Sequence, residues 1–156
     1  MYSLNSIRNS LLRALGRIER KLKQESYLFD ASSIFEAISR NRIELLVKNY
    51  TIELAKYELI NILWKRLFLE RDVSKEECDH IIEIIKNTLK LMHLLNINCN
   101  EKETFDLASK LEITIYDASY VYYAKKLNLK LVTEDQKLKR KIENYIKVCS
   151  IEEILE

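Results

Sequence analysis

The apolar residues of the chain form two kinds of pattern, which predict alternating helices and strands. Recurrence at three- and four-residue spacing is typical of a helix with one buried face, whereas short continuous apolar runs are typical of strands buried in a parallel sheet. The expected helices cover about 4–24, 33–40, 54–70, 74–92, 100–111, 114–127 and 136–144. The expected strands cover about 27–29, 47–52, 93–98, 129–133 and 145–149.

Capping residues support these boundaries. Pairs of residues three apart have the spacing of a capping box or a related cap, in which side chains satisfy the exposed backbone donors of a helix start. These pairs are Ser33 and Glu36, Ser74 and Glu77, Asn100 and Glu103, and Ser150 and Glu153. Helices alternating with buried strands predict a three-layer α/β/α domain with a central, mostly parallel sheet.

The composition agrees with one folded domain and excludes other classes of protein. A chain of 156 residues is long enough for a single hydrophobic core. No apolar run approaches the roughly 18 residues that a membrane-spanning helix needs. Three cysteines without a Cys-x-x-Cys pair favour neither a disulfide framework nor a thiolate zinc site. We therefore expect a cytoplasmic protein with no membrane partner.

The first 26 residues differ in charge from the rest of the chain. They carry six basic and two acidic side chains, so their net charge is +4, and the remainder is −2 within a total of +2. We expect residues 1–26 to be an extension containing a basic amphipathic helix, and residues 27–156 to be the main domain. The helix would pack on its own domain or on a second subunit of a homodimer, bind RNA or a partner, or direct targeting.

Three aspartates stand where an α/β sheet places its ligands. Asp30 and Asp135 follow expected strands, and Asp117 lies in the first turn of an expected helix, where backbone N–H groups favour a carboxylate. The alternative is that Asp30 and Asp135 are ordinary turn or cap residues. Because Ser33 and Thr114 are available as caps, we interpret the carboxylates as ligands of a hard divalent cation.

Four segments around these acids resemble the motifs of PIN domains, in matching order and spacing. The segments are Tyr27–Ser32, Tyr57–Leu63, Tyr116–Ala124 and Leu131–Asp135. The resemblance covers about residues 27–150, and the VapC-type toxins of prokaryotic toxin–antitoxin systems are nearest in length. It implies an endoribonuclease that uses Mg²⁺ or Mn²⁺, cleaves RNA and pairs with an antitoxin protein. The N-terminal helix departs from the pattern, since a typical member begins almost at its first strand.

The resemblance also assigns the site. It implies that Asp30, Glu58, Asp117 and Asp135 are the metal-binding and catalytic acids, and that Thr133 orients them by hydrogen bonding. Periodicity alone places Glu58 in a helix and gives it no role in a site.

Several other polar residues have two interpretations each. Asn61, one helical turn after Glu58, either reaches the pocket or is a buried helix amide. Glu36 and Glu134 are either extra ligands or capping and solvated carboxylates. Three basic residues after the fourth motif either contact RNA phosphates or form a solvated helix face, and three tyrosines either stack on bases or pack in the core. These are Lys137, Lys139 and Arg140, and Tyr120, Tyr122 and Tyr123.

Two other functions are consistent with the same pattern. A non-catalytic PIN-like module would bind RNA or a protein through the basic helix without cutting. A receiver-like phosphoacceptor domain would also place aspartates at strand ends, but the central phosphoacceptor and late lysine that it requires are not convincingly placed.

Overall fold

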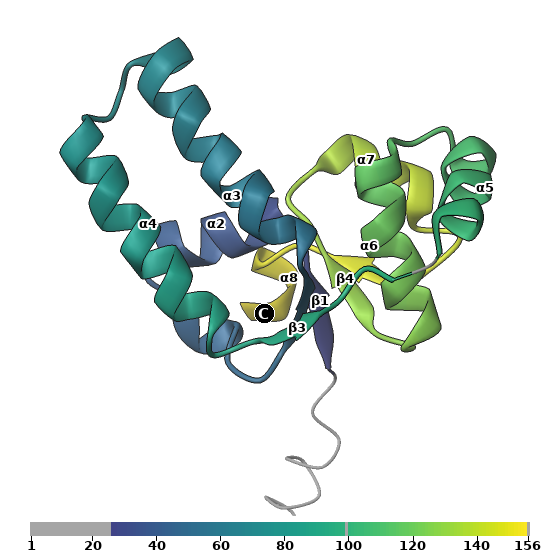
Figure 1. Cartoon of the computed structure of the whole chain (residues 1–156). Helices are drawn as coiled ribbons and strands as arrows, with labels where there is room; N and C mark the ends of the chain where they lie inside the picture. Colours follow the sequence, from purple (N-terminus) through teal and green to yellow (C-terminus); the bar gives the residue numbers. More distant parts are fainter. Residues whose placement is uncertain (1–25, 99, 156) are drawn as a thin grey trace, which may run out of the picture.

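A parallel sheet of five short strands lies at the centre of the protein (Figure 1). The structure is a computed structural model, and it describes residues 26–98 and 100–155. The strands are β1 (Tyr27–Phe29), β2 (Tyr50–Ile52), β3 (His93–Leu95), β4 (Lys130–Val132) and β5 (Val148–Cys149). Their order is β3-β2-β1-β4-β5, and each neighbouring pair is parallel.

Helices cover both faces of the sheet, which confirms the predicted three-layer α/β/α fold (Figure 1). On one side lie α2 (Ala31–Ser39), α3 (Leu54–Lys65) and α4 (Lys75–Leu89). On the other side lie α5 (Glu101–Leu111), α6 (Ile115–Lys126) and α7 (Gln136–Ile142). The short helix α8 (Glu152–Leu155) is joined to the end of α2 by an ion pair of 2.7 Å between Arg40 and Glu152.

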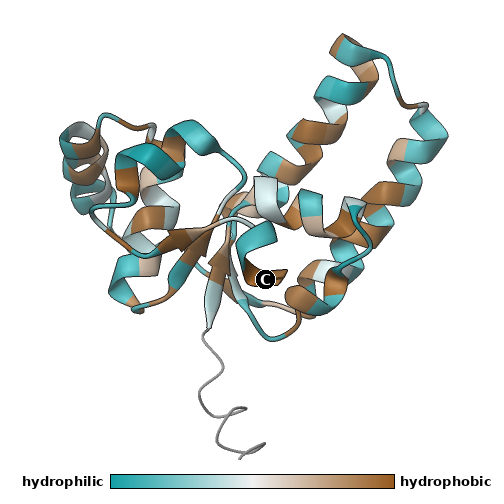
Figure 2. Cartoon of the chain, turned by 180° about the vertical axis from the view of Figure 1, so that it is seen from behind, coloured by the Kyte–Doolittle hydropathy of each residue, from teal (hydrophilic) through white to brown (hydrophobic). Residues whose placement is uncertain are grey.

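The strands are short apolar runs because both faces of the sheet are covered. Leu28 and Phe29 in β1, and Leu131 and Val132 in β4, are completely buried. Apolar residues accordingly gather on the strands and on the helix surfaces turned toward them (Figure 2). The chain leaves β1 toward β2 and β3 but leaves β4 toward β5, so the strand order reverses between β1 and β4. Ligands of such sheets bind beyond the strand ends at this point.

Four strands are shorter than the sequence predicts: β2, β3 and β5 by three residues each, and β4 by one residue at each end. Residues 43–45 form a 3₁₀ turn, η1 (Ile43–Leu45), and β2 starts only at Tyr50. The backbone N–H groups of Tyr145 and Ile146 both bond to the carbonyl of Ile142, which delays β5. β3 also ends early, at Leu95. The expected helix 54–70 is present, but its last five residues form a wider π turn, η2 (Arg66–Glu70).

Two of the predicted caps are confirmed and two are wrong. Ser74 and Glu77 form a capping box, and Ser150 exchanges bonds with Glu153. Ser33 is not the cap of α2, because it already lies inside the helix, with its hydroxyl 2.9 Å from the carbonyl oxygen of Val132. Asn100 makes no side-chain cap bond, and its amide instead faces the Thr104 hydroxyl at 3.4 Å.

The expected N-terminal helix, residues 4–24, lies outside the described residues. The division between residues 1–26 and 27–156 therefore stays a prediction. Within the described ranges, no helix is long and apolar enough to cross a membrane.

Candidate active site

Asp30 and Asp135 follow the two central strands at the point where the strand order reverses. Asp30 comes directly after β1, and its backbone N–H donates to the carbonyl of Val132, the last residue of β4, at 3.1 Å. Asp30 is buried, whereas Asp135 is exposed. The ends of the two central strands therefore carry one buried and one exposed carboxylate.

Asp30 is buried among hydrogen-bond donors. Its Oδ1 accepts bonds of 2.8 Å from the backbone N–H of Ser33 and from the hydroxyl of Ser32. Burial raises the pKa of the Asp30 carboxyl, although hydrogen bonds from Thr133, Ser33 and Ser32 act in the opposite direction. The ionised form is thus held in place but remains poorly solvated, so a nearby cation would stabilise it.

Glu58 is brought to the same place by the second turn of α3. Its side chain is half-buried, and its Oε1 accepts a bond of 3.0 Å from the hydroxyl of Tyr120 on α6. Burial raises the pKa of Glu58, and the negative charges of Asp30 and Asp117 raise it further, while the Tyr120 bond lowers it. Asp30, Glu58 and Asp117 therefore form one cluster, in which the carboxylates repel one another.

Asp117 is the third residue of α6. The predicted cap is confirmed here, because the N–H of Asp117 donates to Thr114 Oγ1 at 3.1 Å. The Thr114 hydroxyl in turn donates to Oδ2 of Asp117 at 2.8 Å. This reciprocal pair fixes the half-exposed carboxylate at the positive end of the helix.

Asp135 caps α7, as the alternative interpretation proposed. Its Oδ1 accepts from the backbone N–H groups of Lys137 at 2.8 Å and Leu138 at 3.0 Å. Asp30 likewise caps α2, so the argument that Ser33 makes Asp30 unnecessary as a cap is wrong, whereas the matching argument for Thr114 and Asp117 is confirmed. Asp30 comes directly after β1, and Asp135 comes two residues further beyond the end of β4; both stand at an N-cap position, where Asp is preferred. The cap bonds of both residues use Oδ1.

Thr133 connects the two central aspartates. It is completely buried, its Oγ1 accepts from the Asp135 N–H at 3.1 Å, and its side chain also hydrogen-bonds to Asp30. Ser32 makes a second connection, because its hydroxyl donates to Asp30 and accepts from the Glu134 N–H at 3.1 Å. Both hydroxyls tie the end of β4 to the carboxylate that follows β1.

The chemistry of these donors fits a divalent metal ion. All four predicted ligands are carboxylates, which Mg²⁺ and Mn²⁺ prefer, and none takes part in an ion pair formed by the described residues. As the side chains stand, no three His, Cys, Asp and Glu residues within 26–98 and 100–155 are arranged to hold an ion. Hydroxyl groups of Tyr120 and Thr114 occupy oxygens of Glu58 and Asp117 instead.

Sequence reasoning missed the role of Tyr120. Packing was one of its two interpretations, and the side chain is indeed only 1% exposed, but its hydroxyl also reaches Glu58. Burial raises the pKa of Tyr120, and the charges of Glu58 and Asp30 raise it further. The hydroxyl therefore keeps its proton and donates it in the hydrogen bond to Glu58. The available signal was its spacing, because Tyr120 lies three residues after Asp117 on one helix face.

The remaining candidates are exposed or have other partners. Asn61 is exposed, so its interpretation as a buried helix amide is wrong. Lys139 pairs with Glu153, while Lys137 and Arg140 are exposed. Three further side chains have structural partners: Glu36 pairs with Arg40, Glu134 accepts from the N–H of Ile151, and the Tyr123 hydroxyl donates to the carbonyl of Asn96.

Replacing Tyr120 with phenylalanine is expected to make cleavage by this site more sensitive to acid. The change removes the hydrogen bond that lowers the pKa of Glu58, so more of Glu58 is protonated at a given acidic pH. A hydrogen bond to a charged group is strong enough for a rate loss on the order of tenfold at acidic pH, with little loss at alkaline pH. A pH–rate profile of each protein measures this, with Tyr116→Phe, an exposed tyrosine of the same helix, as the control. Equal loss at every pH would contradict it.

Comparison with known proteins gives one consistent family. The family model of the PIN domain matches residues 26–143. Ribonuclease VapC3 of Pyrobaculum aerophilum is 37% identical over 95 residues, covering 59% of this chain and 70% of that protein. Exonuclease VapC9 of the same organism is 30% identical over 128 residues, covering 78% of this chain and 90% of that protein.

Solved structures agree with this assignment. The crystal structure of PAE2754 from Pyrobaculum aerophilum has a TM-score of 0.69 and 26% identity, covering 84% of this chain and 93% of that chain. A toxin–antitoxin complex from Klebsiella pneumoniae has the same fold, with a TM-score of 0.58 and 17% identity over 80% of this chain and 96% of that chain. The sequence match and the sheet order together establish that this chain belongs to the PIN domain family.

Proposed function

We propose that the protein is a metal-dependent ribonuclease that hydrolyses phosphodiester bonds of RNA at the acidic cluster. Asp30, Glu58, Asp117 and Asp135 would hold Mg²⁺ or Mn²⁺, and Thr133 would orient Asp30. The observation that carries this proposal is the set of carboxylates around the reversal point, where burial raises the pKa of Asp30 and Glu58 and the charges of Asp30 and Asp117 raise the pKa of Glu58 further. Such repulsion is costly unless a cation offsets it.

The side chains of the cluster would position the reaction without forming a covalent bond to RNA. When bound, a divalent cation polarises the scissile phosphate and lowers the pKa of the attacking water. Asp30 is fixed by Ser32 and Ser33, so its carboxylate would need little reorganisation. Glu58 and Asp117 are half-exposed, which lets a strand of RNA reach them from solvent.

The relatives support a nuclease but differ in the mode of cleavage. One is named a ribonuclease and the other an exonuclease. We favour internal cleavage, because the cluster lies at the carboxyl ends of the two central strands, where Asp135 is exposed and no chain end is needed for access.

A circular single-stranded RNA distinguishes the two modes, since it has no ends. The protein is expected to linearise and then fragment the circle with Mn²⁺ or Mg²⁺, and to leave it intact in EDTA. The measurement is gel electrophoresis beside a linear RNA of the same sequence. Cleavage of the linear RNA alone would contradict internal cutting. Binding of both without cleavage in any metal would favour the non-catalytic RNA-binding module.

The structural neighbours suggest a protein partner as well. Two of them are toxin–antitoxin complexes, from Klebsiella pneumoniae and from nontypeable Haemophilus influenzae, where the VapBC-1 chain has a TM-score of 0.54 and 17% identity over 80% of this chain and 96% of that chain. We include an antitoxin, and a homodimer of this chain, in the proposal. Co-purification with the product of an adjacent reading frame, followed by light scattering of the complex and of the isolated protein, tests both.

A further inference from the structure

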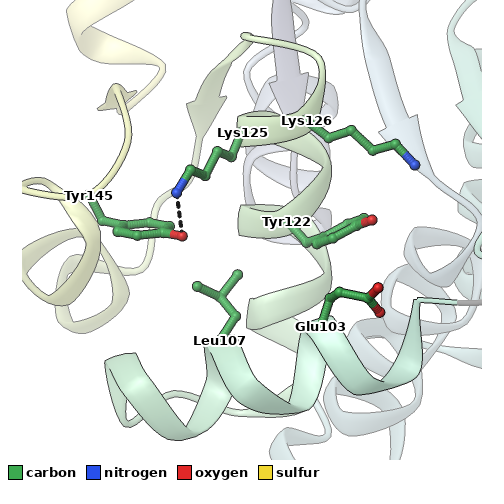
Figure 3. Close-up of a pocket in the computed structure, with 6 residues that line it drawn as sticks. All are labelled: Glu103, Leu107, Tyr122, Lys125, Lys126 and Tyr145. Atoms are coloured by element: carbon green, nitrogen blue, oxygen red, sulfur yellow. Dashed lines mark hydrogen bonds between the residues drawn. The ribbon is translucent and has the colours of Figure 1, made fainter.

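A pocket separate from the acidic cluster lies toward the opposite end of α6 from Asp117. It has a volume of about 320 Å³ and is lined by Glu103, Leu107, Tyr122, Lys125, Lys126 and Tyr145 (Figure 3). Lys125 follows Asp117 by eight residues (125 − 117), which places the pocket roughly 12 Å along the helix axis from the acidic cluster. The two sites are therefore separate but within reach of one extended strand.

Lysine side chains and tyrosine rings alternate around this pocket. The Nζ atom of Lys125 lies 3.9 Å from the ring centroid of Tyr145 and donates to its hydroxyl at 2.5 Å (Figure 3). The Nζ atom of Lys110 lies 5.0 Å from the same centroid. Tyr145 thus holds two ammonium groups in place before any ligand arrives, which lowers the entropy cost of binding.

Tyr122 provides an aromatic surface beside these lysines. Its side chain is half-buried, projects from α6 between Lys126 and Glu103, and has Lys126 Nζ 5.5 Å from its ring centroid (Figure 3). Every nucleic-acid base can stack on such a ring, regardless of its identity.

The positive charge of the pocket is only partly offset. Among the ion pairs formed by described residues, none includes Lys110, Lys125 or Lys126. Lys125 and Lys126 line the pocket with Glu103, which leaves a surplus of one positive charge in the lining (2 − 1), and Lys110 lies beside it against the Tyr145 ring. Lysines around an aromatic ring match the two parts of a nucleotide, the phosphate and the base.

We propose that this pocket binds a single-stranded segment of RNA outside the cleavage site, with phosphates on Lys110, Lys125 and Lys126 and a base stacked on Tyr122. This inference rests on the proposed ribonuclease function, because it extends the path of the same substrate. The pocket would add affinity without taking part in the reaction, and would make binding depend on the length of the RNA.

The test is the affinity of a fluorescent, unstructured RNA of twelve nucleotides, measured by anisotropy in EDTA. Combined Lys110→Gln, Lys125→Gln and Lys126→Gln changes are expected to weaken binding by at least about tenfold and to lower the slope of log affinity against log salt by about 2. The matched control is the combination Lys56→Gln, Lys86→Gln and Lys90→Gln, which removes the same charge at a groove between α3 and α4. An equal loss in both proteins would overturn the proposal.

Two single changes separate stacking and charge from a loss of folding. Tyr122→Leu is expected to weaken RNA binding at least about fivefold, while Tyr122→Phe keeps it. Glu103→Gln is expected to strengthen binding severalfold, an effect that damage to the fold does not produce. If either variant, Tyr122→Leu or Glu103→Gln, binds RNA with the affinity of the unchanged protein, the proposal is overturned.

The affinity measurement in EDTA does not depend on cleavage. If no RNA is cleaved in any metal, the ribonuclease proposal fails, but the measured affinities still show whether the pocket binds RNA. If the lysine variants cleave a trinucleotide normally and a long RNA more slowly, both proposals stand. A higher affinity for duplex DNA than for the single-stranded RNA would overturn the pocket proposal and leave the ribonuclease proposal standing.

Discussion

Replacing Asp30 with asparagine is expected to lower the rate of RNA cleavage by at least about 1000-fold while the protein stays folded. Metal chemistry contributes several kcal/mol to such a reaction, and each 1.36 kcal/mol is a factor of about ten. The fold is expected to survive because asparagine keeps the Oδ1 atom that accepts from the Ser33 N–H, and Asn caps a helix about as well as Asp. The measurement is single-turnover cleavage with Mn²⁺ at saturating protein.

The control for Asp30→Asn is Asp79→Asn. Asp79 is an exposed aspartate of α4 whose partner is Lys75, so its loss changes the net charge equally without touching the cluster. Circular dichroism and thermal melting of both variants establish that they are folded. Cleavage by Asp30→Asn at a rate near that of the unchanged protein would remove Asp30 from the site.

The metal-free protein is expected to lose stability as the pH rises, and added metal is expected to restore it. The pKa values of Asp30 and Glu58 are raised in the folded state, so the folded protein binds more protons than the unfolded chain between the ordinary and the raised values. The free energy of unfolding therefore falls as the pH rises through that window, and this penalty is absent below the ordinary carboxyl pKa.

The size of the metal effect follows from mass action. A ligand present at 100 times its dissociation constant stabilises the folded state by about 2.7 kcal/mol, or about 5–10 °C in the melting temperature of a chain of this size. Thermal melts in EDTA and in Mn²⁺ from pH 5 to pH 8 measure both effects. Asp30→Asn is expected to be less sensitive to pH and to Mn²⁺ than the unchanged protein. The same Mn²⁺ shift in both proteins would contradict metal binding by Asp30.

The fold could be predicted because its signals are local and repeated. Leu28 and Phe29, or Leu131 and Val132, read as buried strands because parallel strands have no solvated face. The positions of Asp30 and Asp135 followed from those strands, since Asp30 is the first residue after β1 and Asp135 the third after β4. Strand lengths were less accurate, because contacts such as the Ile142 carbonyl with Tyr145 replace sheet bonds at the ends.

The details of the site depend on contacts between distant parts of the chain. Glu58 and Tyr120 are 62 residues apart, and nothing in the pattern of either helix indicates that they meet. Periodicity alone gave Glu58 no role, and only the resemblance to PIN domains selected it. The cap of α2 was misassigned because both Asp30 and Ser33 suit an N-cap, and the choice depends on where β1 ends.

A crystal structure of the protein soaked in Mn²⁺, with anomalous diffraction recorded, tests the central claim most directly. The predicted result is a manganese peak at the carboxyl ends of β1 and β4, with carboxylate oxygens of Asp30 and at least two of Glu58, Asp117 and Asp135 as ligands or bonded to its waters. Glu58 or Asp117 would then have released its hydroxyl partner, Tyr120 or Thr114. A soaked crystal with no manganese at this cluster, or with the ion bound only elsewhere, would contradict the account.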